Sequence, residues 1–222
     1  MISMYPYLLP NSRFRQYKLK VEVNGKPKWI ILGKIYSQEQ LAQEIAKYKP
    51  KDTYQTISWW LNPQKLGGKH IILPKYLSPK DKRAIKEAKL DDFLSNIFLG
   101  SDYIMDFDDK DYASTDEAIN NLVLAKLGLK QLGFKKFMTI RTGKGYQLFV
   151  FDFNEWAKKG LKAVMPRDRE YAYLNKMRLL TSKLKDMKIK WDYDVSCDTR
   201  RICRVPNTYH NNGNLIRVIG YD

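Results

Sequence analysis

Two aspartates at the end of an apolar segment are the residues whose type and spacing most directly indicate chemistry in this sequence. Asp106 and Asp108 lie at the end of the strand-like run DYIMDF at 102–107. Because side chains alternate along a strand, the two carboxylates share one face while Phe107 points to the other. Two like charges so close are costly unless a cation neutralises them, and ligation by oxygen alone suits Mg²⁺ or Mn²⁺. The alternative, a solvated acidic turn, stays open at this point.

A second cluster of acids follows much later, in the segment WDYDVSCD at 191–198. Asp192, Asp194 or Asp198 has the chemistry to complete a metal site with the first pair. In two-metal phosphoryl transfer, carboxylates hold a pair of cations that activate the attacking hydroxyl and stabilise the leaving group. Acids of a surface loop are the alternative for this segment.

Two further segments carry groups suited to phosphate. The turn Thr142-Gly143-Lys144-Gly145 between two apolar runs brings backbone N–H groups and one ammonium close together, although a plain hairpin turn has the same composition. It is not a Walker A loop, which needs GxxxxGK followed by Ser or Thr.

The later segment TRRICRVPNTYH places Arg201 and Arg204 on a strand-like run, with His210 shortly after it. Arginines are unusual on a buried strand unless they meet an anion, so we favour phosphate over solvent as their partner.

The elements that must position these groups are readable from turn and cap signals. Asn24-Gly25 predicts a hairpin within 18–33, and Ser37 with Gln40 begins a predicted helix at 38–48. The other expected strands are at 54–60, 102–107, 136–141 and 146–152, and near 201–205 and 215–219. A helix is expected from Ser114 to about Gly133, with Ile119, Leu122 and Leu129 inward. A basic helix is expected at 168–187, and its inward residues are Tyr171, Leu174, Leu180, Leu184 and Met187. The segment 68–98, with a helix starting at Ser78-Pro79, reads as an inserted element. The pattern predicts a single α+β domain over 1–222, with a largely antiparallel mixed sheet flanked by helices.

Composition narrows the partners. Forty Lys and Arg against 24 Asp and Glu give a formal net charge of +16, which favours nucleic acid as the partner. No run approaches the length of a membrane span, and Pro6 and Pro10 break the N-terminal apolar run, so we expect a soluble, cytoplasmic protein without a membrane association. Cys197 and Cys203 match no zinc-ligand spacing with His70 and His210, so we expect two buried, reduced thiols and no structural zinc.

Taken in order, these segments resemble the small, catalytic subunit of archaeal DNA primase, within the archaeo-eukaryotic primase superfamily. That family has a strand ending in Asp-x-Asp, here IMDFDD; a Ser-Gly-Arg-Gly-Tyr-His turn, here TGKGYQ at 142–147; and an Asp-rich segment running into Arg-Leu-Pro-x-Ser-x-His, here Asp192 to His210. Weaker matches are SRF at 12–14 and ISWWLNP at 57–63, so the resemblance covers most of the chain outside the insertion.

The resemblance implies a primase catalytic core of the RRM-like type that makes or extends primers in DNA replication, using nucleoside triphosphates on a single-stranded DNA template. It implies Mg²⁺ or Mn²⁺ at a two-metal site, and a partner similar to the primase large subunit. It also implies that Asp198 and Arg201 form a structural pair. The implied metal ligands and catalytic residues are Asp106, Asp108 and Asp192, with Asp194 as the fallback, and the implied nucleotide-binding residues are Thr142, Lys144, Gln147, Arg204, His210 and Lys34.

The chain departs from the family pattern in three ways. Gln147 stands where the family has a histidine, which predicts weaker nucleotide binding because a neutral amide replaces an imidazole. The cysteine-rich zinc element of many members is absent, and only about 45 residues separate Gln147 from Asp192. Two alternatives to a polymerising enzyme therefore stay open: a non-catalytic relative that binds nucleic acid or a replication partner, and an Asp-dependent nuclease.

Overall fold

The computed structural model describes residues 5–61, 63, 98–159, 161, 164, 168–211 and 213–222. The inserted element expected at 68–98, including the helix from Ser78, lies outside the described residues apart from Phe98. The described elements are, in chain order, η1 (Ser12–Phe14), β1 (Tyr17–Val23), β2 (Lys26–Ile31), α1 (Gln38–Tyr48), β3 (Asp52–Thr56), β4 (Ser58–Trp60), β5 (Phe98–Ser101), β6 (Tyr103–Asp108), η3 (Asp109–Asp111), α4 (Thr115–Gln131), β7 (Phe137–Arg141), β8 (Gly145–Val150), α5 (Phe153–Lys158), α6 (Arg169–Asp186), α7 (Tyr193–Ser196), β9 (Ile202–Arg204) and β10 (Arg217–Tyr221).

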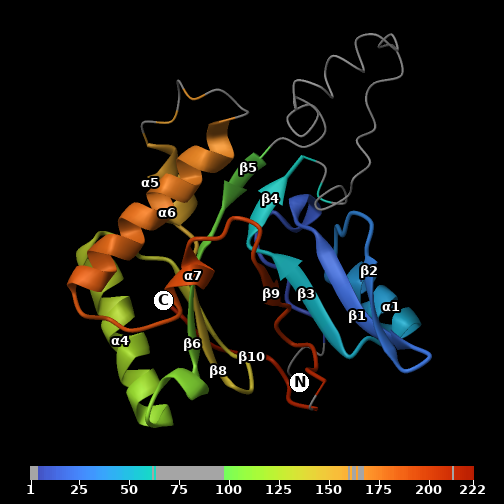
Figure 1. The fold of residues 1–222 in the computed structure, drawn as a ribbon. Coiled ribbons are helices and arrows are strands. Elements are labelled where there is room, and N and C mark those ends of the chain that lie inside the picture. Colours follow the sequence, from blue (N-terminus) through green and yellow to red (C-terminus); the bar gives the residue numbers. More distant parts are fainter. Residues whose placement is uncertain are drawn as a thin grey trace.

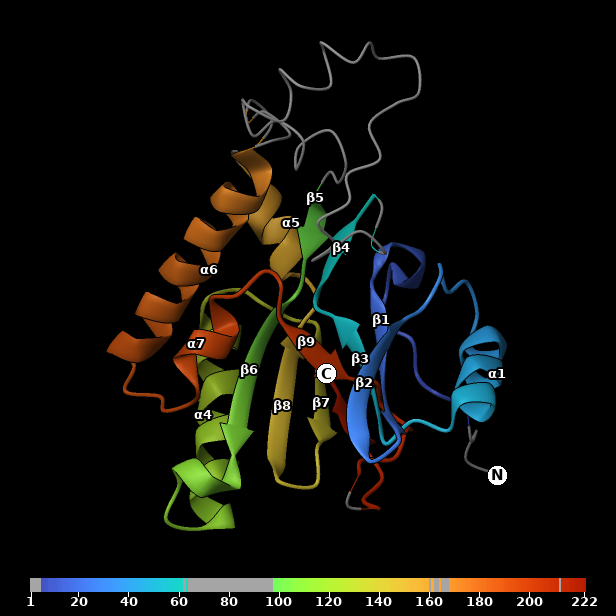
Figure 2. The same ribbon diagram turned by 45° about the vertical axis from the view of Figure 1, so that its right-hand side comes forward.

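The strands form two four-stranded sheets, ordered β2-β1-β3-β9 and β10-β7-β8-β6, and a two-stranded sheet of β4 and β5. The described pairings between these strands are antiparallel. Figures 1 and 2 show α4 and α6 on the outer side of the β6 sheet and α1 on the outer side of the β1 sheet. The α+β class with antiparallel pairing is confirmed, but the single sheet expected from the sequence is divided into three.

Each large sheet has its own core because each is backed by its own helices. Tyr17, Leu19 and Val21 alternate inward along β1 and pack with Leu41 of α1. The larger core lies between the β6 sheet and the helices α4 and α6. With the helices outside, the sheet faces turned away from them are free to line a site.

Local signals in the sequence determine several element boundaries. Asn24 and Gly25 have φ values of 52° and 74°, as a two-residue hairpin turn requires. The Ser37 hydroxyl accepts the N–H of Gln40 at 3.2 Å, and the Ser114 hydroxyl accepts the N–H of Glu117 at 3.1 Å. The hairpin and the starts of α1 and α4 are therefore confirmed.

The inward faces of the two long helices agree with the sequence prediction only in part. In α6, Leu180 and Leu184 are buried as expected, together with Tyr173 and Met177, whereas Tyr171 is exposed and Met187 is 38% exposed. The Tyr173 ring packs edge-on against the Phe98 ring, with 5.0 Å between the ring centres. This contact favours the rotation of α6 that turns Tyr173 inward. In α4, Leu122 and Leu129 are buried as expected and Ile119 is not.

One strand prediction needs correction, and two short helices were not predicted. The strand expected at 54–60 is interrupted at Ile57, so that β3 and β4 belong to different sheets. The short helices α5 and α7 were not expected, because four to six residues give too little periodicity to recognise.

Cys203 is buried and Cys197 only partly so, and both are free. None of the described helices combines the length and the apolar character needed to span a membrane.

A buried ion pair joins the two halves of the fold. Arg15 Nη2 lies 2.5 Å from Asp102 Oδ2, just before β6, and both side chains are almost fully buried. Arg15 also donates to the carbonyls of Thr56 and Ile57, at 2.8 and 2.6 Å, where β3 gives way to β4. Burial raises the pKa of Asp102 to about 6, although the adjacent Arg15 guanidinium acts to lower it. The pair therefore fixes the β1 sheet against the start of β6.

Candidate active site

The paired acids of β6 lie as strand alternation predicts. Phe107 is fully buried in the core, and Asp106 and Asp108 line a cavity on the opposite face. Asp106 is 8% exposed, whereas the Asp108 side chain is about one third exposed and lies 3.4 Å from Lys110 Nζ. The two carboxylates thus occupy one wall of the cavity at different depths.

The turn after β7 contacts the end of β6 so closely that only glycine fits. Gly145 has a φ of 142°, and a Cβ placed on it would lie 2.1 Å from the Phe107 carbonyl oxygen. The Asp109 N–H donates to the Lys144 carbonyl at 2.8 Å, which holds the turn against the strand. Thr142 is buried and lines the cavity, while the Lys144 side chain is exposed and does not.

Asp192 joins the opposite edge of β6 through its main chain. Its N–H donates to the Asp106 carbonyl at 3.0 Å, forming an isolated antiparallel bridge between these two residues. The Asp192 carboxylate accepts the N–H of Asp194 at 3.2 Å and so caps α7. The structure therefore brings Asp192 next to Asp106 in the backbone, and its side chain is engaged in a local cap.

The cavity has a volume of about 300 Å³ and lies between the two large sheets. Its acidic wall comes from β6, and its cationic wall comes from Arg201 and Arg204 at β9. The remaining lining residues are Tyr54, Thr142, Gln147, Ile202 and Cys203. Opposite charges therefore face each other across a space open to a small ligand.

Asp106 has a pKa raised to about 6. Burial is the main cause, and the negative charges of Asp108 and Asp192 act in the same direction. Gln147 Nε2 donates to Asp106 Oδ2 at 3.3 Å, which, together with the charge of Arg201, partly offsets the increase. Asp108 and Asp192 thus lie close enough to Asp106 for their charges to contribute to its raised pKa.

The fit of these residues to a divalent cation is partial. Asp106 and Asp108 offer oxygen ligands on one face, and the buried Oε1 of Gln147 beside them has no hydrogen-bond partner. Within the described ranges, however, no group of three or more His, Cys, Asp or Glu side chains is arranged to hold a metal ion. The Asp192 carboxylate accepts the N–H of Asp194 in the α7 cap, and Asp192 is not among the residues that line this cavity.

Arg204 is held by a buried relay of polar groups. Arg204 Nη2 donates to His210 Nε2 at 3.1 Å, and His210 Nδ1 lies 2.5 Å from Asp52 Oδ1. Because the guanidinium can only donate, His210 Nε2 accepts from Arg204, while Nδ1 lies against the Asp52 carboxylate and the N–H of Asn211, which is 2.7 Å away. Asp52 is 1% exposed, so His210 lies between Arg204 and a buried carboxylate. His210 is not among the residues that line the cavity.

Two other assignments from the resemblance are placed differently. Lys34 lies in the loop between β2 and α1, where its carbonyl accepts from Gln40 Nε2, and it is not among the residues lining the cavity. The Asp198 carboxylate accepts the N–H of Arg200 at 2.8 Å, whereas the Arg201 side chain lines the cavity and lowers the pKa of Asp106. The Arg201 side chain thus faces the site, while its main-chain N–H donates to the Asp198 carbonyl at 3.2 Å.

Sequence reasoning missed Tyr54 and Asp52. Both belong to β3, which pairs with β9 in a register that sets Tyr54 opposite Arg204. The Arg204 guanidinium lies 5.8 Å from the centre of the Tyr54 ring. Nothing in the segment DTYQT identifies these residues, because their importance depends on a strand pairing across about 150 positions.

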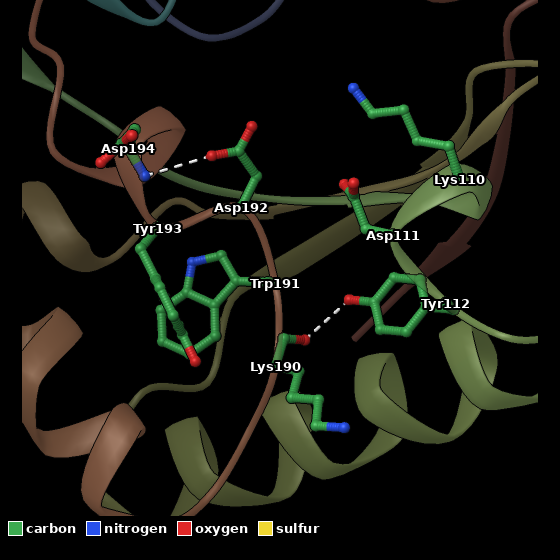
Figure 3. A pocket seen from close by; sticks show the side chains of 8 residues that line it. All are labelled: Lys110, Asp111, Tyr112, Lys190, Trp191, Asp192, Tyr193 and Asp194. Carbon is green, nitrogen blue, oxygen red and sulfur yellow. Dashed lines mark hydrogen bonds between the residues drawn. The ribbon is translucent and has the colours of Figure 1, made fainter.

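A second cavity, of about 420 Å³, is lined by Asp192 and its neighbours (Figure 3). Its lining comes from η3, from Tyr112 that follows η3, and from the segment 190–194. Asp194, the fallback metal ligand, lines this second cavity and not the first. Figure 3 shows Asp192 at its border, with the aromatic side chains of Trp191 and Tyr193 on one side and Tyr112 on the other.

The raised pKa of Asp106 predicts a specific pH dependence of stability. Because the pKa in the folded chain, about 6, exceeds that of an unfolded Asp, about 4, the folded state binds the proton more tightly. The resulting stabilisation is complete below about pH 4 and is lost as the pH rises through 6. In a chelating buffer, Asp106→Asn should raise the free energy of unfolding at pH 7.5 by about 2 kcal/mol, with no gain at pH 4.

Urea unfolding of both proteins at the two pH values measures this difference. Asp186→Asn, at an exposed residue that ends α6, is the control and should show no gain at either pH. A variant no more stable than the wild type at pH 7.5 would contradict the assignment of a strained, buried carboxylate.

Comparison with known proteins adds no identification. No protein-family model matches this sequence, and no curated protein matches it.

Proposed function

We propose that this protein is a template-directed nucleotidyltransferase that makes or extends primers, as a primase-polymerase does. The observation that carries the proposal is the cavity between the sheets, with the acids of β6 on one wall and Arg201 and Arg204 on the other. Acids suit divalent cations and arginines suit phosphate, so this pairing fits the metal-bound triphosphate of a nucleotide.

The element order supports a primase-like core of the RRM-like type. The order β6-α4-β7-β8-α6, with the short helix α5 before α6 and with β8 between β7 and β6 in the sheet, is a split β-α-β-β-α arrangement. After α6 the chain returns to the free edge of β6 at Asp192, as a final strand of such a motif would. We therefore extend the proposal to the fold family.

On this proposal the cationic wall binds the triphosphate. Arg204, fixed by His210 and Asp52, and Arg201 would donate to phosphate oxygens, and the buried Thr142 lies on the same cavity. Gln147 reaches Asp106 and so contributes to the acidic wall. Gln147, which stands where the primase family has a histidine, therefore has a role next to the acids on this proposal.

The reaction joins a strand to an incoming nucleotide. The 3′ oxygen forms a bond to the α-phosphorus while the bond from that phosphorus to the bridging oxygen breaks, pyrophosphate leaves with the electron pair, and the hydroxyl proton passes to solvent. Bound Mg²⁺ or Mn²⁺ would stabilise the charge that develops on the phosphate oxygens. Asp106 and Asp108, joined by Asp192 when it leaves its cap, would hold the cations, and Arg201 and Arg204 would fix the phosphates.

A primer-extension assay with labelled nucleotides tests the proposal. The isolated chain, a primed single-stranded DNA template and Mg²⁺ or Mn²⁺ should give template-dependent incorporation. Shortening of the labelled strand in place of extension would assign a nuclease. The net charge of +16 predicts that the binding of the DNA strand weakens steeply with salt. A protein partner similar to the primase large subunit is part of the same proposal.

One observation favours the non-catalytic alternative. The Asp192 carboxylate caps α7, and the described chain has no three-ligand metal group. A nucleic-acid-binding accessory would keep this arrangement, and would bind single-stranded DNA in a salt-sensitive way without incorporating nucleotides. The extension assay separates the two functions.

Asp52 gives a prediction about nucleotide affinity. Asp52→Asn removes the carboxylate that holds His210 and that also lies 3.8 Å from Arg204 Nε, so the KM for the nucleotide should rise about tenfold while kcat falls much less. Steady-state extension kinetics measure both constants. Asp186→Asn serves as the control for a lost carboxylate. A fall of about tenfold in kcat with an unchanged KM would contradict the positioning role.

A further inference from the structure

The second cavity is lined by Asp192, whose main chain pairs with Asp106 of the candidate active site, and it differs from that site in chemistry. We infer that it binds the terminal nucleoside, base and sugar, of the strand that accepts the new nucleotide. The inference rests on the proposed function and extends it by assigning the second substrate to a place in the structure.

The charges of this cavity disfavour phosphate. Asp111, Asp192 and Asp194 outnumber Lys110 and Lys190 among its lining residues, and no arginine lines it. Both lysines are already near carboxylates: Lys110 Nζ lies 3.4 Å from Asp108, and Lys190 Nζ lies 3.6 Å from Glu117. The arginines line the first cavity instead, so the two cavities separate a phosphate-binding space from one suited to an uncharged polar group.

Aromatic side chains form facing walls of this space, as Figure 3 shows. Trp191 and Tyr193 pack edge-on at 4.4 Å between ring centres on one side, and Tyr112 lies on the other. The Tyr112 hydroxyl donates to the Lys190 carbonyl at 2.7 Å, and the Tyr193 hydroxyl donates to the Ile189 carbonyl at 3.0 Å. Because these bonds fix the rings before any ligand arrives, a base can stack without ordering them first.

Carboxylates complete the recognition of a sugar. Asp111 and Asp194 are exposed residues on the cavity lining, and a ribose or deoxyribose hydroxyl donates well to a carboxylate. Asp192 borders the cavity and pairs by its main chain with Asp106. A nucleoside held here therefore has its hydroxyl next to the acids, with the triphosphate on their other side.

The test uses single-stranded DNA with 2-aminopurine as its 3′-terminal base, in Mg²⁺ and without nucleotide. Binding to the wild-type chain should quench the probe. In Tyr112→Ala the quenching should disappear and the affinity should fall about tenfold, as expected for one lost base–aromatic stack. Tyr112→Phe keeps the ring and should bind within about twofold of the wild type. Tyr171→Ala, at an exposed tyrosine of α6 that lines neither cavity, should behave as the wild type.

Competition identifies the ligand chemistry. Adenosine should displace the 3′ probe, and inorganic triphosphate should not do so at the same concentration. Equal quenching in Tyr112→Ala and the wild type, or displacement by triphosphate as effective as by adenosine, overturns the inference. These readouts need no catalysis: a chain that incorporates nothing but shows the Tyr112 dependence refutes the proposed function alone, and one that extends primers without it refutes this inference alone.

Discussion

Nucleotide incorporation should fall by about three orders of magnitude or more when Asp106→Asn is combined with Asp108→Asn. The two amides keep the shape of the side chains and remove the negative charge from the wall that faces Arg201 and Arg204. If that wall holds the cations that stabilise the reacting phosphate, no other described pair of acids on the cavity can replace it. Extension of a labelled primer, measured over a range of Mg²⁺ and Mn²⁺ concentrations, gives the rate.

The control for this experiment must match the change in charge. Asp116→Asn combined with Asp186→Asn also removes two carboxylates, both exposed and neither on the cavity, so it alters the attraction for DNA by the same net charge. The control should retain the wild-type rate within about threefold. Incorporation by the Asp106 and Asp108 double variant within about tenfold of the wild type would reject the assignment of the acids, whatever the control does.

Loss of the cation that joins the two halves of the fold should have the largest effect on stability. Arg15→Met leaves Asp102 buried without its cationic partner and removes the guanidinium donors to the carbonyls of Thr56 and Ile57. The free energy of unfolding should fall by about 3–5 kcal/mol. Lys51→Met, which breaks an exposed ion pair with Glu22, should cost less than about 1 kcal/mol. Urea unfolding followed by circular dichroism measures both variants.

The same variant has a characteristic pH dependence. Because burial already raises the pKa of Asp102 and Arg15 opposes that rise, removal of Arg15 should raise the pKa further. Protonation then removes the unpaired charge, so the loss of stability should be smaller at pH 5 than at pH 8. A loss below about 1 kcal/mol that is the same at both pH values would show that the ion pair contributes little.

The sequence predicted those parts of the site that depend on local rules. Alternation along one strand was enough to put Asp106 and Asp108 on one face, and the Gly145 turn was recognised from its composition. The cationic wall was recognised in part, because arginines on a strand are costly without an anion. Hairpin and cap signals likewise gave the starts of β2, α1 and α4.

What the sequence could not provide are contacts between distant segments. Tyr54 and Asp52 acquire a role only because β3 pairs with β9, and the break at Ile57 only because the next strand joins another sheet. The capping bond that engages the Asp192 carboxylate depends on the four-residue helix α7, too short to predict from periodicity. The inward face of α6 was misjudged for a related reason, since Tyr173 is selected by its contact with Phe98, 75 positions earlier.

The main-chain bond from Asp192 to Asp106 has a consequence for biosynthesis. On the ribosome, the strand that carries Asp106 emerges long before its neighbour at Asp192, and Asp52 emerges well before His210. Nascent chains therefore expose an unfinished sheet edge while about 85 further residues are made. The nascent polypeptide should complete the cavity between the two sheets abruptly, near the end of translation of this segment, and shorter ribosome-bound intermediates are the species that need protection from aggregation.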